Sequence, residues 1–122
     1  MVDPHSKSTE LAYLSAHEVL ARLENGTLTS TQLVTALIER INAVDADGTT
    51  TSLHSIAAVH DEAINCAKER DDERTRGISR GPLHGVPVII KDNIEAIGLP
   101  GLAGSTSLIL SLIHISEPTR PY

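Results

Sequence analysis

Residues 81–105 read GPLHGVPVIIKDNIEAIGLPGLAGS, and this stretch decides the fold that the sequence predicts. Within it, Val86 to Lys91 form a continuous apolar run that ends in a single charge. Gly81-Pro82 and Gly85 precede the run, and an Asp-Asn pair follows it. A short run of this kind is typical of a strand that is covered on both faces, as in the interior of a mainly parallel sheet. The sequence therefore predicts a strand that carries Lys91 to its carboxyl end, where open α/β sheets place ligands.

Lys91 is the potentially reactive group of this stretch. A lysine that is removed from water gives up its proton more readily and can then act as a base. The alternative is that Lys91 only ends a strand and keeps its amino group in water, as most lysines do. The spacing of residues does not decide between these two interpretations.

The stretch closely resembles the amidase signature family, whose members are serine hydrolases of amides. In that family a strand carrying G-P-L-x-G-[IV]-P leads into K-D-N and then into a loop that contains A-G-S. The matching residues here are Gly81, Pro82, Leu83, Gly85, Val86, Pro87, Lys91, Asp92, Asn93, Ala103, Gly104 and Ser105. The resemblance implies an α/β fold with a mixed β-sheet flanked by helices, and a Ser-cisSer-Lys triad in which a neutral lysine draws a proton from a bridging serine.

Lys91 matches the lysine of that triad and is the catalytic residue that the resemblance implies. The two serines belong to a later Gly/Ser-rich stretch of the family, which this sequence lacks. Gly104 and Ser105 match a loop on the substrate side of the family's site, so a structural role is expected for Ser105. No role is assigned to His84. The resemblance implies the truncated N-terminal portion of an amidase that acts on a small-molecule amide, and we expect the chain alone to be inactive.

The composition argues against several other classes of protein. The net charge is -6 and the basic residues are scattered, so we expect no direct contact with nucleic acid. The apolar stretches are too short to cross a membrane. The single cysteine, Cys66, excludes an internal disulfide, and the first residues lack the apolar core of a signal peptide, so the sequence predicts a cytoplasmic setting. Cys66 itself is expected to be a small core residue.

The histidines near the ends of a second predicted strand, at residues 53–59, are candidate metal ligands. His54 and His60 lie beside Asp61 and Glu62, which are suitable ligand types. Residues six apart on a strand are about 20 Å from each other, so the two histidines cannot share an ion without a bend. We therefore expect neither a metal nor a cofactor.

Three helices are predicted around these strands. Ser15 and Glu18 form a capping box for a helix over residues 16–24, which Asn25-Gly26 ends. A second capping box, at residues 29 and 32, begins a helix that runs to about residue 43. A third helix starts at residue 61, and its charged tail, residues 68–76, is predicted to be a solvated face. Residues 1–10 show no periodicity and are predicted to be a flexible arm.

The end of the chain differs from the rest. From residue 110 the sequence reads LSLIHISEPTR, followed by Pro-Tyr, and this string resembles a translated sequencing adapter. The predicted organisation is therefore an arm at residues 1–10, the amidase signature portion at 11–109 and a non-native tail at 110–122. Because the apolar run would lack neighbours to cover it, we expect the isolated chain to be insoluble or molten.

Two other functions fit the sequence. One is the glutaminase-type A subunit of a tRNA-dependent amidotransferase, in which partner subunits would carry the nucleic acid. The other, from a different class, is a non-catalytic interaction module formed by the two capped helices, whose apolar faces could dock on a partner. The sequence indicates neither the identity of the amide nor the oligomeric state.

Overall fold

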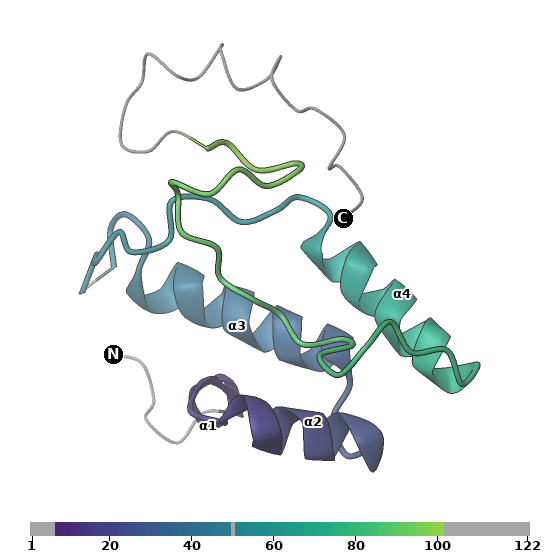
Figure 1. Cartoon of the computed structure of the whole chain (residues 1–122). Coiled ribbons are helices and arrows are strands. Elements are labelled where there is room, and N and C mark those ends of the chain that lie inside the picture. The colour runs from purple at the N-terminus through teal and green to yellow at the C-terminus, as the bar shows by residue number, and fades with distance from the viewer. Residues whose placement is uncertain (1–6, 50, 102–122) are drawn as a thin grey trace. The chain divides into compact units, whose positions relative to one another are not determined.

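The computed structural model describes residues 7–49 and 51–101. Their regular structure is four helices, α1 (Lys7–Ala12), α2 (Ala16–Glu24), α3 (Ser30–Val44) and α4 (Ala63–Thr75) (Figure 1). The chain divides into two compact units, Met1–Ile56 with Glu62–Pro87, and Ala57–Asp61 with Val88–Tyr122. All four helices belong to the first unit.

Both predicted capping boxes are confirmed. The Ser15 hydroxyl accepts a hydrogen bond from the Glu18 backbone N–H at 3.2 Å, and the Glu18 carboxylate accepts one from the Ser15 N–H at 2.8 Å. Thr29 and Gln32 make the same pair of bonds, each 3.1 Å long, at the start of α3. These reciprocal bonds satisfy backbone donors that the first turn of a helix leaves unpaired. Helices α2 and α3 therefore begin where the sequence predicts.

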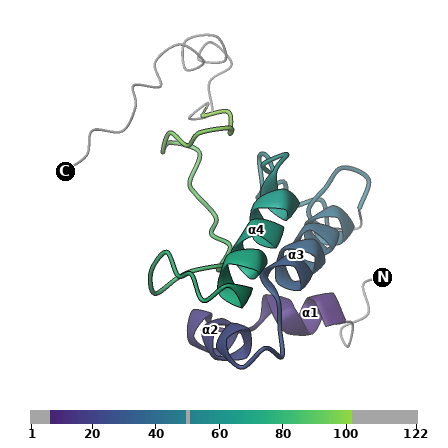
Figure 2. The same ribbon diagram turned by 90° about the vertical axis from the view of Figure 1, so that its right-hand side faces the viewer.

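The first unit is built around α3, which packs against both α1 and α4 (Figure 2). Helix α1 occupies residues 7–12, in a region where the sequence shows no periodicity. Its Thr9 hydroxyl accepts a hydrogen bond from the Arg40 side chain of α3 at 3.0 Å. The core of the unit is aliphatic, and its buried members are Leu11, Val19, Leu23, Leu28, Leu33 and Ala36.

The predicted strand at residues 53–59 is wrong. His54, within this segment, has a left-handed backbone with φ of 50°, far from the extended φ of a strand residue. The buried carboxylate of Asp45, at the end of α3, accepts the backbone N–H groups of Ser55 and Ile56 at 2.8 Å each. These backbone donors are therefore taken by a side chain rather than by a neighbouring strand.

The strand predicted for Val86–Lys91 is also wrong, and with it the mixed β-sheet flanked by helices. Residues 7–49 and 51–101 contain no strand at all. A strand exists only where another extended segment pairs with its backbone N–H and C=O groups, and the described residues supply none. The side chains of Val88 and Ile89 are accordingly 69% and 82% exposed. An apolar run alone does not identify its pairing partner.

Helix α4 departs from the prediction in two respects. Cys66, expected in the core, is exposed. Glu73, expected on a solvated face, is buried.

No helix in the described ranges is both long enough and apolar enough to span a membrane. The predicted tail at 110–122 lies outside the described residues, and the domain boundaries after residues 10 and 109 stay predictions.

Candidate functional site

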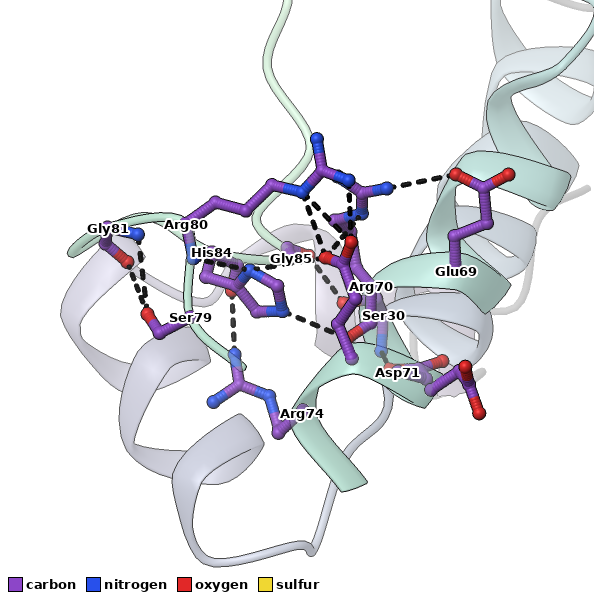
Figure 3. Close-up of polar contacts among 12 residues, drawn as sticks. Ser30, Glu69, Arg70, Asp71, Arg74, Ser79, Arg80, Gly81, His84 and Gly85 are labelled. Atoms are coloured by element: carbon purple, nitrogen blue, oxygen red, sulfur yellow. Dashed lines mark hydrogen bonds and ion pairs between the residues drawn. The ribbon is translucent and has the colours of Figure 1, made fainter. Parts of the chain in front are cut away.

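The first half of the signature stretch, Gly81–Pro87, belongs to the first unit and is held there by the end of α4. That helix stops in a Schellman motif, in which the Ile78 N–H donates to the Glu73 carbonyl at 2.8 Å and the Gly77 N–H to the Arg74 carbonyl at 3.0 Å. The motif reverses the direction of the chain. The residues that follow are thereby returned to the side of α4 (Figure 3).

An ion pair fixes the start of this returning segment. Both carboxylate oxygens of Glu73 lie 3.0 Å from Nε of Arg80, and Arg70 Nε approaches the same carboxylate at 3.3 Å. The hydrogen bond from Arg80 is the main reason why the pKa of Glu73 is lowered, although burial opposes it. Glu73 is therefore held as a carboxylate between two guanidinium groups.

His84 is the most deeply buried residue of the segment, with 6% of its surface exposed. Its Nδ1 accepts the backbone N–H of Arg80 at 3.2 Å, and its Nε2 lies 2.9 Å from the backbone carbonyl of Arg70. A ring nitrogen that accepts an N–H carries no proton, so the proton is on Nε2, which donates to the carbonyl. The nearest carboxylate oxygen, of Glu73, is 3.9 Å from Nδ1, too far for a hydrogen bond. The contacts assign the neutral Nε2–H tautomer.

Two successive backbone carbonyls of the segment are clamped by different helices. Arg74 of α4 donates from Nη2 to the His84 carbonyl at 2.7 Å. Ser30, the first residue of α3 and 1% exposed, donates from its hydroxyl to the Gly85 carbonyl at 2.7 Å. The segment is thus attached to α3 and α4 at adjacent peptide groups (Figure 3).

Asp71 connects the two helices behind this clamp. Its carboxylate accepts the backbone N–H groups of Ser30 and Thr31 at 2.7 and 2.9 Å, and the Thr31 hydroxyl at 2.6 Å. These are donors of the first turn of α3, which also favours a negative charge. Burial alone would raise the pKa of Asp71, but the hydrogen bonds from Thr31 and Ser30 together outweigh it and lower the pKa.

The close contact with Ser30 requires glycine at position 85. The φ angle of Gly85 is +83°, and a Cβ atom built there would lie 2.2 Å from the Ser30 hydroxyl oxygen. Side chains are disfavoured at such φ values in any case. The next residue, Val86, is half-buried against the aliphatic core. The glycine of the signature is therefore explained by a contact that the structure shows.

Lys91, the one predicted site residue that the structure describes, is not part of this cluster. Lys91 belongs to the second unit, where it is exposed, and its backbone carbonyl accepts the Ile94 N–H at 2.9 Å. Gly104 and Ser105 lie outside the described residues. Their roles stay predictions. No group of three or more His, Cys, Asp or Glu side chains that could hold a metal is found within 7–49 and 51–101.

Sequence reasoning missed the residues that hold the segment. The run at 68–76 is so highly charged that it resembles a solvated surface. Arg70, Asp71 and Arg74 nevertheless follow the small buried residue Ala67 at intervals of three, four and seven positions. Residues at those intervals share one face of a helix. This spacing, behind a buried alanine, is the signal that the sequence offered.

Comparison with known proteins gives consistent results. The sequence pattern of the family described as Amidase matches residues 32–112. A Schizosaccharomyces pombe protein named as a putative amidase is 38% identical over 92 residues, which are 75% of this chain and 15% of that protein. The A subunit of a glutamyl-tRNA(Gln) amidotransferase from Renibacterium salmoninarum is 41% identical over 100 residues, or 82% of this chain and 18% of that protein.

A solved structure is similar as well. The crystal structure of PAM12A superimposes with a TM-score of 0.74 at 41% sequence identity, covering 80% of this chain and 20% of that one. The chain thus spans a fifth or less of the length of these proteins. With two thirds of its residues inside the family's sequence pattern, the chain belongs to the amidase family.

Proposed function

We propose that this chain supplies the lysine of an amidase that hydrolyses the carbon–nitrogen bond of a small amide through a Ser-cisSer-Lys triad. The observation that carries the proposal is that Lys91 follows the signature segment at the expected distance, inside the region that matches the amidase family. The surrounding protein would have to remove the Lys91 amine from water, because it is exposed in the 122-residue chain.

In the proposed reaction, neutral Lys91 takes a proton from a bridging serine while that serine takes the proton of the nucleophilic serine. The nucleophile attacks the amide carbon, the carbon–nitrogen bond breaks and the amine leaves with a proton from the relay. Water then attacks the acyl-enzyme and releases the acid. Backbone N–H groups would hold the oxyanion. Both serines would come from a longer protein, of which residues up to about 109 would form the N-terminal part.

The test is to extend the reading frame beyond residue 109 and assay the full-length product with a simple aryl amide. We expect Lys91→Ala to lower kcat/KM by at least about a thousandfold, because the nucleophile loses its base. Lys91→Arg should not restore activity, since arginine stays protonated. The 122-residue chain should show no turnover. Turnover by the short chain that Lys91→Ala abolishes would show that the nucleophile lies within it.

A second candidate is the glutaminase-type A subunit of a tRNA-dependent amidotransferase. It is supported by the similarity to amidotransferase A subunits, including a Chloroflexus aurantiacus protein that is 37% identical over 100 residues. In that case glutamine would be the amide, and partner subunits would contact the tRNA. Glutamine hydrolysis that appears only when partner subunits are added would select this candidate. Hydrolysis of an aryl amide by the isolated protein would select the first.

The observed packing disfavours the third candidate, an interaction module formed by the two capped helices. Val19 and Leu23 of α2 and Leu33 of α3 are buried in the core of the first unit, so the apolar faces are already occupied.

We also propose a reducing, cytoplasmic compartment. Its support is the single cysteine of the sequence, Cys66, which is an exposed free thiol.

A further inference from the structure

We propose that Asn25 is a site of spontaneous deamidation and that the cap at the end of α2 controls the rate of the reaction. Asn25 is followed by Gly26, and both residues are exposed. Because glycine has no Cβ, its backbone nitrogen can approach a neighbouring side chain without steric hindrance. The other asparagines of the chain, at positions 42, 65 and 93, do not precede a glycine. The reaction consumes only water and does not involve Lys91.

The reaction takes place at the side-chain amide of Asn25. The Gly26 nitrogen gives its proton to a base of the solvent and forms a bond to Cγ. The bond from Cγ to Nδ2 breaks, and Nδ2 takes a proton from water and leaves as ammonia. The product is a five-membered cyclic imide. Water then opens this imide at Cγ, which gives aspartate, or at the former backbone carbonyl, which gives isoaspartate with the main chain running through Cβ and Cγ.

The folded cap keeps the two reacting atoms apart. Asn25 is the C-cap residue, with φ of -83° and ψ of 0°, and its N–H donates to the Ala21 carbonyl at 3.1 Å. At this ψ the Gly26 nitrogen eclipses the Asn25 backbone nitrogen and is turned away from the Asn25 side chain. Attack on Cγ requires the reacting atoms to be close and aligned. The backbone must therefore rotate about ψ, out of the cap, before the ring can close.

Thr27 holds the side chain of Asn25 in this arrangement. Oδ1 of Asn25 accepts the Thr27 N–H at 3.0 Å and the Thr27 hydroxyl at 2.6 Å. The same hydroxyl lies 3.5 Å from the Arg22 carbonyl, in the last turn of α2. Rotation of Asn25 out of the cap breaks the bonds to Oδ1, so the Thr27 hydroxyl opposes the reaction. Helix ends nevertheless open more easily than the rest of a fold, and each opening allows the ring to close.

Deamidation damages the junction between α2 and α3. Isoaspartate lengthens the main chain by a carbon atom shortly before Leu28, which is buried in the core, and Thr29, which caps α3. Either product also places a carboxylate beside Glu24 at the C-terminal end of α2, where the helix dipole disfavours a negative charge. The deamidated chain should therefore be less stable than the original.

The experiment follows each asparagine by peptide mapping and mass spectrometry during incubation at neutral pH. The 122-residue chain is made soluble by Ile89→Lys and Ile97→Lys, at exposed positions outside the four helices, and is incubated in buffer and in guanidinium chloride. Thr27→Val removes the hydroxyl but keeps the branched shape. The matched control is Thr75→Val, because Thr75 is an exposed threonine of α4 whose hydroxyl donates to the Asp71 carbonyl at 3.0 Å.

In guanidinium chloride we expect Asn25 to react faster than the other asparagines, at the same rate in the Thr27→Val variant and in its parent. In buffer the parent should react at least about tenfold more slowly, because only the fraction of chains with an open cap reacts. Thr27→Val should raise the rate in buffer about two- to tenfold, the factor that corresponds to the loss of a hydrogen bond. Thr75→Val should leave the rate at Asn25 unchanged.

Each part of the inference has a result that would overturn it. Reaction at Asn25 that is no faster than at positions 42, 65 and 93 in guanidinium chloride would overturn the assignment of the site. Equal rates in buffer and in guanidinium chloride, or a rate in buffer that Thr27→Val does not change, would overturn control by the cap. An unchanged urea midpoint of the purified isoaspartate form would overturn the damage to the junction.

Discussion

At the scale of single residues, the side chain of Asp71 satisfies several hydrogen-bond donors at once. Its one carboxylate accepts two backbone N–H groups and one hydroxyl from the first turn of α3, although it belongs to α4. Helix caps of this kind are usually local, as Thr29 is for the same helix. A cap supplied by another helix also joins the two helices, so its loss should destabilise both of them.

Asp71→Ala is therefore expected to destabilise the first unit by about 1–2 kcal/mol, the range found when a helix cap is removed. Hydrogen exchange of the first turn of α3 should become roughly 5- to 30-fold faster. The matched control is Asp72→Ala. Asp72 is exposed and only pairs with Arg76 at 2.9 Å, an interaction worth about 0.3–0.5 kcal/mol. Equal effects of the two substitutions would show that Asp71 is not a cap.

Gly85 allows a second prediction at this scale. Gly85→Ala should destabilise the clamp, because the new Cβ would meet the Ser30 hydroxyl at 2.2 Å in a backbone with φ of +83°. Gly48→Ala is the control, because Gly48 has a similar φ of +78° and open space around it. The Gly48→Ala substitution should lower the free energy of unfolding by only about 1 kcal/mol, because alanine is strained at this φ angle. The larger cost at position 85 would appear as a lower urea midpoint of the helical signal, measured on a chain made soluble by Ile89→Lys and Ile97→Lys.

A double substitution identifies the cause. In a Ser30→Ala background the hydroxyl is gone, so Gly85→Ala should cost less than it does in the natural sequence. If the cost stays the same, the contact with Ser30 is not the reason why glycine occupies position 85.

At the scale of elements, the ends of α3 and α4 are tied to other segments by carboxylates. The pKa values of Asp45 and Asp71 are lowered, the first mainly by the hydrogen bond from Ser55 and the second by hydrogen bonds that outweigh burial. The pKa of Glu73 is lowered mainly by Arg80. A carboxylate whose pKa is lower in the folded than in the unfolded chain stabilises the fold above its unfolded pKa. That stabilisation is lost as the pH falls through its folded pKa.

The helical unit should consequently be less stable in acid. In a chain made soluble by Ile89→Lys and Ile97→Lys, we expect the urea midpoint of the helical signal to be lower at about pH 3 than at about pH 6. Most of the loss should lie below the ordinary carboxyl pKa of about 4. The substitutions Asp45→Asn and Asp71→Asn should each make the midpoint less dependent on pH. A midpoint that rises on acidification would contradict the roles assigned to these carboxylates.

The same elements show what a sequence can and cannot predict. The starts of α2 and α3 were predictable because a capping box is local, with partners three residues apart. The clamp was not, because Ser30 and Gly85 are 55 positions apart and nothing in either residue type indicates a contact between them. The predictions of the two strands were wrong for a related reason. Apolar runs at 53–59 and 86–91 show a preference for burial, whereas a strand also needs a pairing partner that periodicity does not reveal. The apolar run drew attention to Lys91, but only the resemblance to a family implies its catalytic role, which stays a prediction.

At the scale of the whole chain, an apolar stretch is left exposed in the second unit. Ile89, Ile94 and Ile97 are 82%, 58% and 85% exposed, and Val88 is 69% exposed. Burying a side chain of this size is worth about 1.5–3 kcal/mol, and typical domains have only about 5–15 kcal/mol of stability. Clusters of this kind on a chain of 122 residues favour self-association.

The 122-residue chain should therefore be insoluble or molten, and it should bind a hydrophobic dye. Replacing Ile89 and Ile97 by lysine should reduce both aggregation and dye binding, because it adds charge to the exposed stretch. The helical content should not change, since both positions lie outside the four helices. A soluble, unmodified chain that melts sharply and cooperatively would contradict this prediction.

The cap that Asp71 provides also has a consequence for the order of events at the ribosome. The first residue of α3 is made 41 positions before the carboxylate that completes its first turn. At roughly 5–20 residues per second, the ribosome makes Asp71 about 2–8 s after Ser30 and Thr31, whose backbone N–H groups lack this acceptor until then. During that interval the nascent helix can begin only from Thr29, and its final anchoring must follow the synthesis of α4.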